Sequence, residues 1–516
     1  MKLNYKRTIF VGFAFFLICA FWQAYDTIIP KILTDKFGMS QTASGVVMAL
    51  DNILGLFILP LFGSLSDRTR TRFGRRTPYI VIGTLVAACS LVCLSFVDNL
   101  QIANLDRVAV IDDPQALHQI YESQSAYKLK NAQGDSFVLE EVFTEEAFCQ
   151  IRSQVEVDGE LTTNPDYTNY VVPARQAYAW QVTADSPAVL VFFVGLLLVV
   201  LLSMAIFRSP AVALMPDVTI KPLRSKGNAI INLMGTAGGM LVLVLGKIFA
   251  TSALRNSMMS YTAFFTVVAG IMVGALAIFL WKVREPQFVR EMREESARYG
   301  IDESDGDDQG EKRKLGAAER RSLLFILASV ALWYMGYNAV TSKYSVYADK
   351  VLNLDYNMTL LIAQGAAIAS YLPVGMLASR IGRKKSILLG VAMLTTAFFC
   401  ASFIRLGSSS LVINCLFAMA GIGWATINVN SFPMVTEMSR GSDIGKYTGF
   451  YYTASMAAQT VTPLLSGYLM DQTSMVSLFP YATIFAALAF VTMLFVRHGD
   501  SRPVSKKGLE ALDVDD

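Results

Sequence analysis

The chain is a succession of long apolar runs separated by short polar segments. A helix of about 20 apolar residues crosses the roughly 30 Å hydrocarbon core of a bilayer. Twelve runs of that kind lie near residues 8–30, 42–64, 78–97, 188–214, 227–250, 261–282, 322–347, 357–379, 385–404, 409–434, 446–470 and 478–497. They predict an all-α membrane protein with twelve transmembrane helices. The first run is too long for a cleaved signal peptide and carries Asp26 in its second half.

One long polar segment, about residues 98–187, separates the third run from the fourth. It is acidic, and its stretches at 106–113, 136–143 and 168–172 alternate apolar with polar residues, as short strands do. We expect this insert to form a small ordered cap, because a long coil without secondary structure is unusual within a compact protein. A disordered acidic loop is the alternative.

A second polar break, residues 283–320, falls between the sixth and seventh runs. Its first part is typical of a surface helix and its second part of a solvated linker, since the segment is dense in charge. The break divides the chain into an N-terminal six-helix bundle at 1–282 and a C-terminal six-helix bundle at 321–500, with a tail at 501–516.

Lysine and arginine gather in the segments after the second, fourth, eighth and twelfth runs, whereas the opposite segments are short and nearly neutral. Cytoplasmic loops of membrane proteins carry such an excess. The bias predicts that both termini and the 283–320 linker are cytoplasmic. It also predicts that the insert between the third and fourth helices lies on the extracytoplasmic side of the cell membrane.

The two halves share a motif after their second helices. The first half has Gly63-Ser-Leu-Ser-Asp67-Arg68, followed by Phe73-Gly74-Arg75-Arg76, and the second has Gly375-Met-Leu-Ala-Ser379-Arg380-Ile-Gly382-Arg383. Glycine permits tight turns and close helix approach, and an acid in such a place can receive arginines of a neighbouring helix. The expected gating residues are Gly63, Asp67, Arg68, Gly74, Arg75, Arg76, Asp217, Gly375, Arg380, Gly382 and Arg383.

Two more matches occur in the same order. Tyr25-Asp26 is followed by Asp35-Lys36 in the first helix, and Tyr337-Asn338 is followed by Asp349-Lys350 in the seventh. The fourth helix ends in Pro216-Asp217-Val-Thr and the tenth in Pro433-Met-Val-Thr. Repeated halves with a binding site between them near the bilayer midplane are typical of transporters that alternate between two openings.

The motif of glycine, aspartate and basic residues resembles that of the major facilitator superfamily. Its extended form, from Gly63 through Phe73-Gly74-Arg75-Arg76 to Pro78, is similar to the sucrose-transporter and glycoside–pentoside–hexuronide branch, as is the segment from Pro210 to Val218. The resemblance covers both halves but neither the insert nor the linker. It implies the twelve-helix facilitator fold and cation-coupled uptake of a sugar or glycoside.

The chain departs from that branch at two places. Sodium-using members carry paired carboxylates four residues apart in the second helix, where this chain has Gly55 and Leu59. Sucrose transporters carry an arginine where this chain has Val212, although Arg208 lies one helical turn earlier and could present a guanidinium on the same face. The sodium site of that branch is therefore not expected here.

Asp26 and Asp51 are acids within the first two apolar runs. An ionised side chain in a bilayer is unfavourable by a few kcal/mol or more and normally faces a cavity, a partner or a proton path. Burial favours the protonated form of a carboxyl group, so such an acid can take up and release a proton. We expect Asp26, Asp51 and the counter-charge Arg208 to couple transport to protons; a purely structural pairing of these groups is the alternative.

Polar and aromatic residues of several helices are candidates for a solute site. A sugar needs an aromatic face for its C–H side and amides or carboxylates for its hydroxyl groups. A single aromatic residue is more often packing, whereas an amide in hydrocarbon needs a partner. Asn428 and Asn430 cannot both face the pore of a regular helix. The expected substrate-binding residues are Gln23, Asp26, Asn52, Tyr337, Asn338, Gln364, Trp424, Asn428, Tyr452 and Gln459.

Composition agrees with a membrane protein and excludes several classes. Charged residues make up 16% of the chain against about 25% in soluble proteins, and the net charge of +3 is too small to indicate a nucleic-acid partner. The two histidines and six cysteines have no metal-like spacing, and no phosphate loop or nucleophile elbow is present. We expect no enzyme activity, cofactor or metal; the partners expected for a monomer are a small solute, a proton and the lipid bilayer.

Two other functions fit the same pattern. A lipid or amphiphile flippase, or an exporter, would use the same fold. A transporter-like receptor would bind solute and signal through its cytoplasmic segments. The number of carboxylates and amides within the helices favours a site for a polar solute over the first, and the moderate length of the linker argues against the second.

Overall fold

A computed structural model describes residues 3–157, 160–220, 223–299, 316–436 and 444–498. Each of the predicted apolar runs lies on a long helix. Ten helical stretches in these ranges are long and apolar enough to cross a membrane, and the remaining two runs lie on α14 and α17, of 26 and 29 residues. The long helices are α1 (Tyr5–Lys31), α3 (Leu50–Arg68), α4 (Thr77–Leu105), α9 (Ala188–Val218), α10 (Arg224–Ile248), α11 (Thr262–Lys282), α13 (Ala317–Tyr347), α14 (Tyr356–Ile381), α15 (Arg383–Ala401), α16 (Ser410–Thr436), α17 (Ile444–Gln472) and α18 (Leu478–Leu494).

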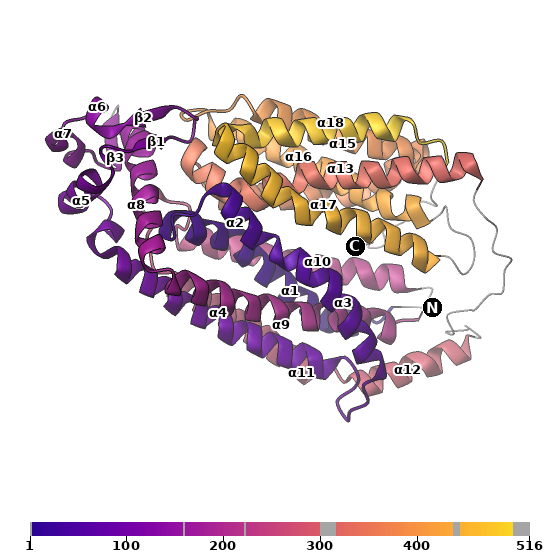
Figure 1. Ribbon diagram of the computed structural model, residues 1–516. Helices are drawn as coiled ribbons and strands as arrows, with labels where there is room; N and C mark the ends of the chain where they lie inside the picture. Colours follow the sequence, from indigo (N-terminus) through magenta and orange to yellow (C-terminus); the bar gives the residue numbers. More distant parts are fainter. Residues whose placement is uncertain (1–2, 158–159, 221–222, 300–315, 437–443, 499–516) are drawn as a thin grey trace.

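The long helices form two bundles that follow the two halves of the sequence (Figure 1). Each half has its own apolar core, one built from the first-half helices and one from the second-half helices. Large apolar residues are exposed on the surface of the bundles: Phe57 and Val191 are 68% exposed, and Trp281 is 73% exposed. Such exposure is unfavourable in water but expected of a surface that faces lipid.

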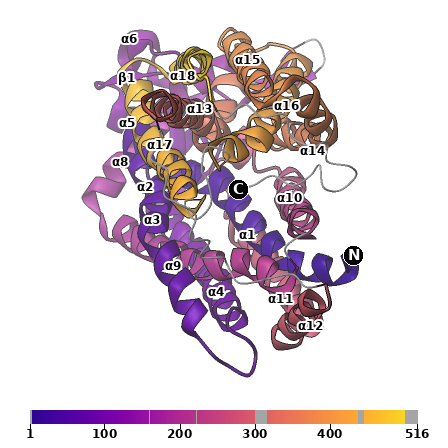
Figure 2. The same cartoon turned by 90° about the vertical axis from the view of Figure 1, so that its right-hand side faces the viewer.

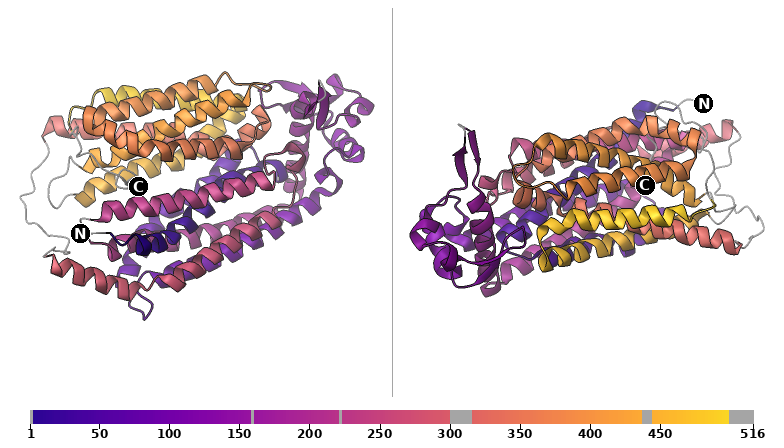
Figure 3. Two further views of the ribbon diagram at one scale, coloured as in Figure 1. Left: turned by 180° about the vertical axis from the view of Figure 1, so that it is seen from behind. Right: turned by 90° about the horizontal axis from the view of Figure 1, so that it is seen from above.

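The bundles meet along two lines (Figure 2). The short helix α2 (Gln41–Met48), which precedes α3, packs on α17, and α10 packs on α14. Helices α1 and α13 lie between these two lines and contact each other. The insert lies at one end of the bundles and the two motif turns lie at the other; we call these ends the insert end and the motif end (Figure 3).

The first helix of each half ends in the same irregular way. A five-residue π-helical segment, Ile32–Lys36, follows α1, and another, Ala348–Leu352, follows α13. Asp35-Lys36 and Asp349-Lys350, which the sequence comparison matched, lie on these two segments. The internal repeat therefore extends to an uncommon backbone feature, and π-helical turns often accompany functional sites.

The insert is a folded unit with its own apolar core. It contains α5 (Pro114–Gln124), β1 (Lys128–Lys130), β2 (Ser136–Val138), α6 (Leu139–Val142), α7 (Glu145–Cys149), β3 (Gln154–Val157), β4 (Glu160–Thr163) and α8 (Val172–Asp185). Strands β1 and β2 form one antiparallel hairpin, and β3 and β4 form a second. Val108, Leu117, Ile120, Phe148 and Tyr167 are among the buried residues of the core.

The structure corrects the predicted strands of the insert. Only residues 136–138 of the three alternating stretches form a strand. Residues 106–109 form a 3-10 turn, and residues 167–171 form a π-helical turn that leads into α8. Each stretch is so short that its alternation does not distinguish a strand from a helical turn with one buried side.

The insert also begins later than predicted. Helix α4 continues to Leu105, past the expected limit at residue 98. Asp98 lies on this last part of α4, where its carboxylate accepts an ion-paired hydrogen bond of 2.6 Å from Lys36. Both side chains are fully buried, so Asp98 belongs to the helical core and residues 106–187 form the insert proper.

Replacement of the insert separates these two parts. Exchange of residues 107–186 for a short polar linker should leave an expressed, membrane-inserted protein, because α4 and α9 stay whole. An exchange that starts at residue 98 should lower the stability by about 3–5 kcal/mol, because Lys36 is then buried without its counter-charge. Thermal unfolding in detergent measures the difference, and equal unfolding temperatures for both replacements would contradict this account of Asp98.

The segment after α11 is helical in its first part. Helix α12 (Glu285–Arg298) lies at the motif end of the first half (Figure 2). The rest of the predicted linker up to residue 315 lies outside the described residues, as does the tail after residue 498.

Candidate functional site

Two buried ion pairs join the halves at the insert end. The Lys31 ammonium lies 2.8 Å from the Asp349 carboxylate, and the Lys350 ammonium lies 2.8 Å from the Asp35 carboxylate. Each pair takes its cation from one half and its anion from the other. All four side chains are at most 7% exposed. We call these four residues the outer lock.

Other polar contacts between the halves lie beside the outer lock. The Lys343 ammonium donates to the Gln41 carbonyl oxygen at 2.7 Å. The Asp471 carboxylate, at the end of α17, accepts hydrogen bonds from the backbone N–H groups of Gln41 and Thr42 at 2.9 and 2.7 Å. A carboxylate at a helix N-terminus is stabilised by the unpaired N–H groups there. The structure is therefore closed between the halves at the insert end.

The gating motif of the first half is held together by its arginines. Arg76 is buried and pairs with Asp67 and, at 2.9 Å, with Asp217. Arg75 pairs with Asp217 at 2.6 Å. The motif thus joins the ends of α3, α4 and α9, and Arg68 is exposed beside it. Asp67 and Asp217 do contact the loop arginines, as expected for gating residues.

Glu285, the first residue of α12, completes this motif and was not recognised in the sequence. Its carboxylate accepts hydrogen bonds from the backbone N–H groups of Arg75, Arg76 and Thr77 at 2.7–3.1 Å. It is 1% exposed. Gly74, with φ of +113°, lies so close that an added Cβ would meet the carboxyl group at 2.2 Å. The acid satisfies N–H groups at the start of α4 that have no intrahelical partner.

The second half shows a different set of contacts at the equivalent turn. Gly382, with φ of +90°, ends α14 and precedes α15. Lys384 donates from its ammonium to the Leu494 and Val496 carbonyl oxygens at 3.0 and 2.6 Å, at the end of α18. Arg380 is exposed, and Gly375 and Arg383 are half-buried. Each half therefore ties its motif to the chain around the end of its sixth long helix.

The predicted coupling acids lie together in the middle of the first half. Asp26 and Asp51 are close enough for their charges to interact, and the charge of Arg208 acts on Asp51. Asn52 donates from its side-chain amide to the Asp51 carboxylate at 2.8 Å. Among the described residues, no ion pair within 4.0 Å joins Arg208 to either acid. The guanidinium instead lies 5.9 Å from the ring centre of Trp22.

A stacked aromatic cluster in the second half lies within electrostatic range of Asp26. The rings of Tyr337 and Trp424 are stacked, with centroids 3.6 Å apart and planes 2° from parallel, and Tyr334 meets Trp424 edge-on. Tyr337 is close enough to Asp26 for electrostatic interaction. The structure thus brings an acid of α1 and an aromatic pair of α13 and α16 to the same level between the halves.

Two predicted amides bond directly across the halves. The Gln364 side-chain N–H donates to the Gln23 side-chain oxygen at 2.7 Å. Both amides lie beside Gly239 of α10, where an added Cβ would be 3.6 Å from each. The Gln364 oxygen is buried and has no hydrogen-bond partner in the described part of the chain. A buried amide oxygen without a partner is unfavourable, so it is a ready acceptor for a solute hydroxyl or a water.

The other predicted substrate residues are placed less directly. Asn338 donates from its amide to the Gln459 backbone oxygen at 3.2 Å, so this hydrogen bond does not use the Gln459 side chain. The ring centroids of Tyr452 and Phe432 lie 6.0 Å apart. Asn428 is half-buried, whereas Asn430 is 1% exposed and donates to the Thr426 oxygen of its own helix. As expected, the two asparagines of α16 do not share an environment.

Several functional candidates were missed by the sequence reasoning. Lys31 and Lys343 occupy equivalent places in the two halves, five residues beyond Asp26 and Asn338. Each binds a group of the opposite half: Lys31 binds the Asp349 carboxylate and Lys343 binds the Gln41 carbonyl oxygen. Comparing charged positions between the repeats would have found them. Tyr25, whose buried hydroxyl has no hydrogen-bond partner among the described residues, lies near both coupling acids.

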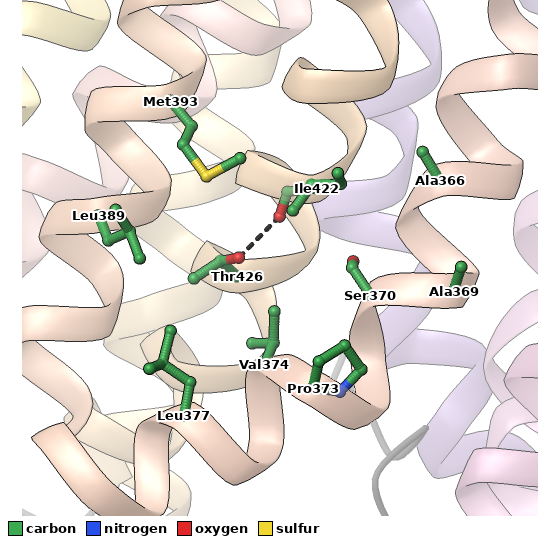
Figure 4. Close-up of a pocket in the computed structure, with 10 residues that line it drawn as sticks. All are labelled: Ala366, Ala369, Ser370, Pro373, Val374, Leu377, Leu389, Met393, Ile422 and Thr426. Atoms are coloured by element: carbon green, nitrogen blue, oxygen red, sulfur yellow. Dashed lines mark hydrogen bonds between the residues drawn. The ribbon is translucent and has the colours of Figure 1, made fainter.

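A separate apolar pocket of about 420 Å³ lies in the second half between α14, α15 and α16 (Figure 4). The two hydroxyl groups in its lining are used within their own helices. Thr426 donates to the Ile422 carbonyl oxygen and Ser370 donates to the Ala367 carbonyl oxygen, both at 2.7 Å. The pocket therefore suits an apolar group and not a sugar. It is lined by Ala366, Ala369, Ser370, Pro373, Val374, Leu377, Leu389, Met393, Ile422 and Thr426.

The two repeated bundles, the closed insert end and the polar site between the halves define a multi-pass membrane transporter and not an enzyme. The chain belongs to the Major Facilitator Superfamily: the model of that family matches residues 177–440 and 365–513. A second model, described as MFS/sugar transport protein, matches residues 10–109. The superfamily assignment made from the gating motif is thereby confirmed.

Curated relatives match over short stretches only. A 68-residue stretch is 37% identical to the putative glycoside/cation symporter YagG of Escherichia coli, and covers 13% of this chain and 15% of that protein. A 62-residue stretch is 37% identical to the uncharacterized symporter YnaJ of Bacillus subtilis, and covers 11% of this chain and 13% of that protein. The matches thus span less than a sixth of either relative.

Solved structures match over nearly the whole chain. The inward open conformation of the xylose transporter XylE from E. coli superposes with a TM-score of 0.58 at 14% identity and covers 99% of both chains. An inward-facing bacterial homologue of the iron transporter ferroportin has a TM-score of 0.57 at 11% identity and covers 96% of this chain and 99% of that one. At these identities the similarity shows the fold.

Asp67→Asn should reduce the turnover of solute more than its binding. Asp67 is 56% exposed and Arg76 keeps Asp217, so the lost pair is worth about 0.5–1 kcal/mol, which corresponds to a two- to fivefold lower rate. The contact belongs to the motif end and not to the solute site, so the dissociation constant should stay the same. Asp217→Asn should have the larger effect, because Asp217 is 14% exposed and holds both arginines. Unchanged turnover with weakened solute binding would contradict this role.

Proposed function

We propose that the chain is a proton-coupled symporter of a sugar or glycoside that works by alternating access. The observation that carries the proposal is that Asp26 lies within electrostatic range of Tyr337, whose ring stacks on Trp424. An acid that can hold a proton is then in the same region as an aromatic face that can hold the C–H side of a sugar. Asp26 would then interact with both the proton and the sugar.

The polar groups around this pair suit hydroxyl groups. Gln23 and Gln364 bridge the halves, and the free Gln364 oxygen can accept from a solute. Asn52 already bonds to Asp51, so protonation of Asp51 would change how that amide is oriented. A sugar that replaced the Gln23–Gln364 hydrogen bond would bind to both halves at once and would favour the conformation in which they are closest.

The contacts at the two ends support a single opening at a time. The outer lock and Asp471 hold the halves together at the insert end. Figure 1 shows the second-half and first-half helices diverging toward the motif end. In this proposal the structure represents the inward-facing member of the cycle, and outward opening requires the outer lock to separate.

The remaining parts of the proposal follow from the charge pattern and the family. The insert end lies outside the cell, the motif end and both termini lie in the cytoplasm, and the protein acts as a monomer in the cell membrane. Protons are the coupling ion because the acids at hand are Asp26 and Asp51, while Gly55 and Leu59 occupy the places of the sodium-site carboxylates of the resembling branch.

The apolar pocket in the second half favours a second candidate, transport of a lipid or amphiphile. A cavity of about 420 Å³ whose hydroxyl groups are already bonded would accept an acyl chain. The pocket lies among α14, α15 and α16 and contains none of the residues of the polar site.

Purified protein in proteoliposomes distinguishes the two candidates. Counterflow of labelled mono- and disaccharides and glycosides should show exchange for at least one of them, and a labelled phospholipid should not cross faster than in protein-free vesicles. Lipid scrambling without sugar exchange would favour the second candidate. Binding of sugar without any exchange would instead identify a receptor and contradict the proposed transport.

A further inference from the structure

The insert is anchored in the first half through α8. Gly38, with φ of +67°, lies so close to α8 that an added Cβ would meet the Trp180 backbone nitrogen at 2.2 Å. The Gln176 amide N–H donates to the Met39 carbonyl oxygen at 3.0 Å, and Gln101 donates to the Thr183 hydroxyl at 3.0 Å. Since the insert is also continuous with α4 and α9, it must move with the first half.

The β1–β2 hairpin of the insert reaches the second half. Lys130 donates from its ammonium to the carbonyl oxygens of Asp471 and Gln472, each at 3.0 Å. The Met475 backbone N–H donates to the Ala132 carbonyl oxygen at 3.0 Å. Ala132 is 9% exposed and is buried in the apolar core of the second half. The hairpin thus holds the end of α17, the same helix whose Asp471 binds α2.

Helix α8 enters the outer lock itself. Lys350, which pairs with Asp35, also donates to the Gln176 side-chain oxygen at 2.9 Å. Gln176 therefore bonds to Met39 of the first half with one end of its amide and to Lys350 of the second half with the other. Because α8 moves with the first half, separation of the halves at this end would break the Lys350–Gln176 hydrogen bond and leave the Gln176–Met39 hydrogen bond in place.

A small cavity beside Gln176 shows that the junction is a specific polar site. Arg175, Asp35 and Asp349 line it, and its volume of about 20 Å³ is enough for one water molecule. Two N–H groups of Arg175 and one carboxylate oxygen of each acid are buried there without a hydrogen-bond partner among the described residues. One water would find both donors and acceptors in this space. Arg175 of the insert therefore lines this cavity together with two acids of the outer lock.

We infer that the insert is a clamp that keeps the two halves together at the insert end. It is anchored in the first half and stabilises the closed insert end by holding the second half through the β1–β2 hairpin and Gln176. Opening toward the insert end requires Lys130, Ala132 and Gln176 to release the second half. The inference rests on the proposed alternating access. It assigns the insert a role in setting the balance between the two conformations.

Distance measurements in lipid nanodiscs test the clamp without any solute. Spin labels at Arg255→Cys and Ser409→Cys, two exposed positions at the insert end of different halves, report the separation of the halves in a background without the native cysteines. Lys130→Met combined with Gln176→Ala should raise the wide-distance population relative to the short-distance one by on the order of tenfold, because several hydrogen bonds are lost. The control Lys128→Met, an exposed lysine on the same strand, should leave the distribution unchanged.

A cross-link keeps the test decisive if the loosened protein fails to fold. Ala132→Cys with Met475→Cys joins backbones already hydrogen-bonded at 3.0 Å. The cross-link is formed by oxidation first, and the spin labels are then attached through thioether bonds, which a reductant does not cleave. The cross-linked protein should have no wide-distance population, and reduction should restore it. Equal distributions for the loosened variant and the control, or a wide population that persists in the oxidised cross-link, would overturn the clamp. Failure of sugar transport would contradict the proposed function and leave these distances unaffected.

Discussion

Neutralising the coupling acids should abolish accumulation of solute against its gradient. In Asp26→Asn and Asp51→Asn the side chain can no longer carry a proton, so a proton gradient cannot be converted into a solute gradient. We expect at least one of the two variants to accumulate no more labelled solute than protein-free vesicles. Uptake into proteoliposomes with an imposed pH gradient measures this.

Exchange of solute separates the two roles that these acids can have. An acid that serves only the proton should leave counterflow intact when it is changed to asparagine. An acid that also hydrogen-bonds the solute should lose counterflow as well, and Asp26, within electrostatic range of Tyr337, is the better candidate for this second behaviour. Asp166→Asn, an exposed acid of the insert, is the matched control and should behave as the unmodified protein. Full accumulation by both helix variants would contradict proton coupling through these residues.

Breaking the outer lock should shift the protein toward opening at the insert end. Asp349→Asn leaves the Lys31 ammonium, 1% exposed, without its carboxylate. Loss of one partner from a buried ion pair is unfavourable by about 3–5 kcal/mol, and the penalty falls on the closed state, since both groups can be hydrated when the halves separate. The ratio of open to closed molecules should therefore rise by about a hundredfold or more. Spin labels at Arg255→Cys and Ser409→Cys report it.

A charge exchange serves as the control for the outer lock. Lys31→Asp combined with Asp349→Lys keeps one cation and one anion at the same places, so it should recover part of the closed population that Asp349→Asn loses. Recovery depends on the pair and not on either residue alone. If Asp349→Asn had the same distance distribution as the unmodified protein, Lys31 and Asp349 would have no part in closing the insert end.

The helices and the internal repeat could be predicted from the sequence. Apolar runs long enough for a bilayer coincide with α1, α4 and the other long helices, because backbone groups in lipid have to be satisfied within a helix. The matched Asp35-Lys36 and Asp349-Lys350 pairs lie on equivalent π-helical turns. The comparison of halves found the equivalence, although it did not show that Asp35 would bond to Lys350.

The pattern of apolar and polar residues does not predict which segments far apart in the sequence contact each other. Glu285 is the first residue of a charged helix and looks like any surface acid, yet it is buried against the start of α4. The predicted boundary at residue 98 placed Asp98 in the insert, but Lys36 of the first half pairs with it. Each of these depends on a partner far away in the sequence, which hydrophobic pattern alone does not identify.

For Arg208, the sequence predicted the interaction of its charge with an acid but not the position of its side chain. Its position one turn before Val212 indicated a counter-charge for the acids, and its charge does act on Asp51. Its guanidinium lies 5.9 Å from the ring centre of Trp22, on the neighbouring helix α1. A helical face predicts direction, but the reach of a long flexible side chain is set by packing with neighbours.

Simultaneous measurement of solute and proton movement tests the central claim most directly. Proteoliposomes that contain a pH-sensitive dye, without an imposed gradient, are supplied with the sugar or glycoside identified by counterflow. Proton-coupled symport predicts that inward solute movement acidifies the lumen, that the signal disappears with a protonophore, and that replacing sodium by potassium changes neither. Solute uptake that requires sodium and leaves the internal pH unchanged would contradict the account.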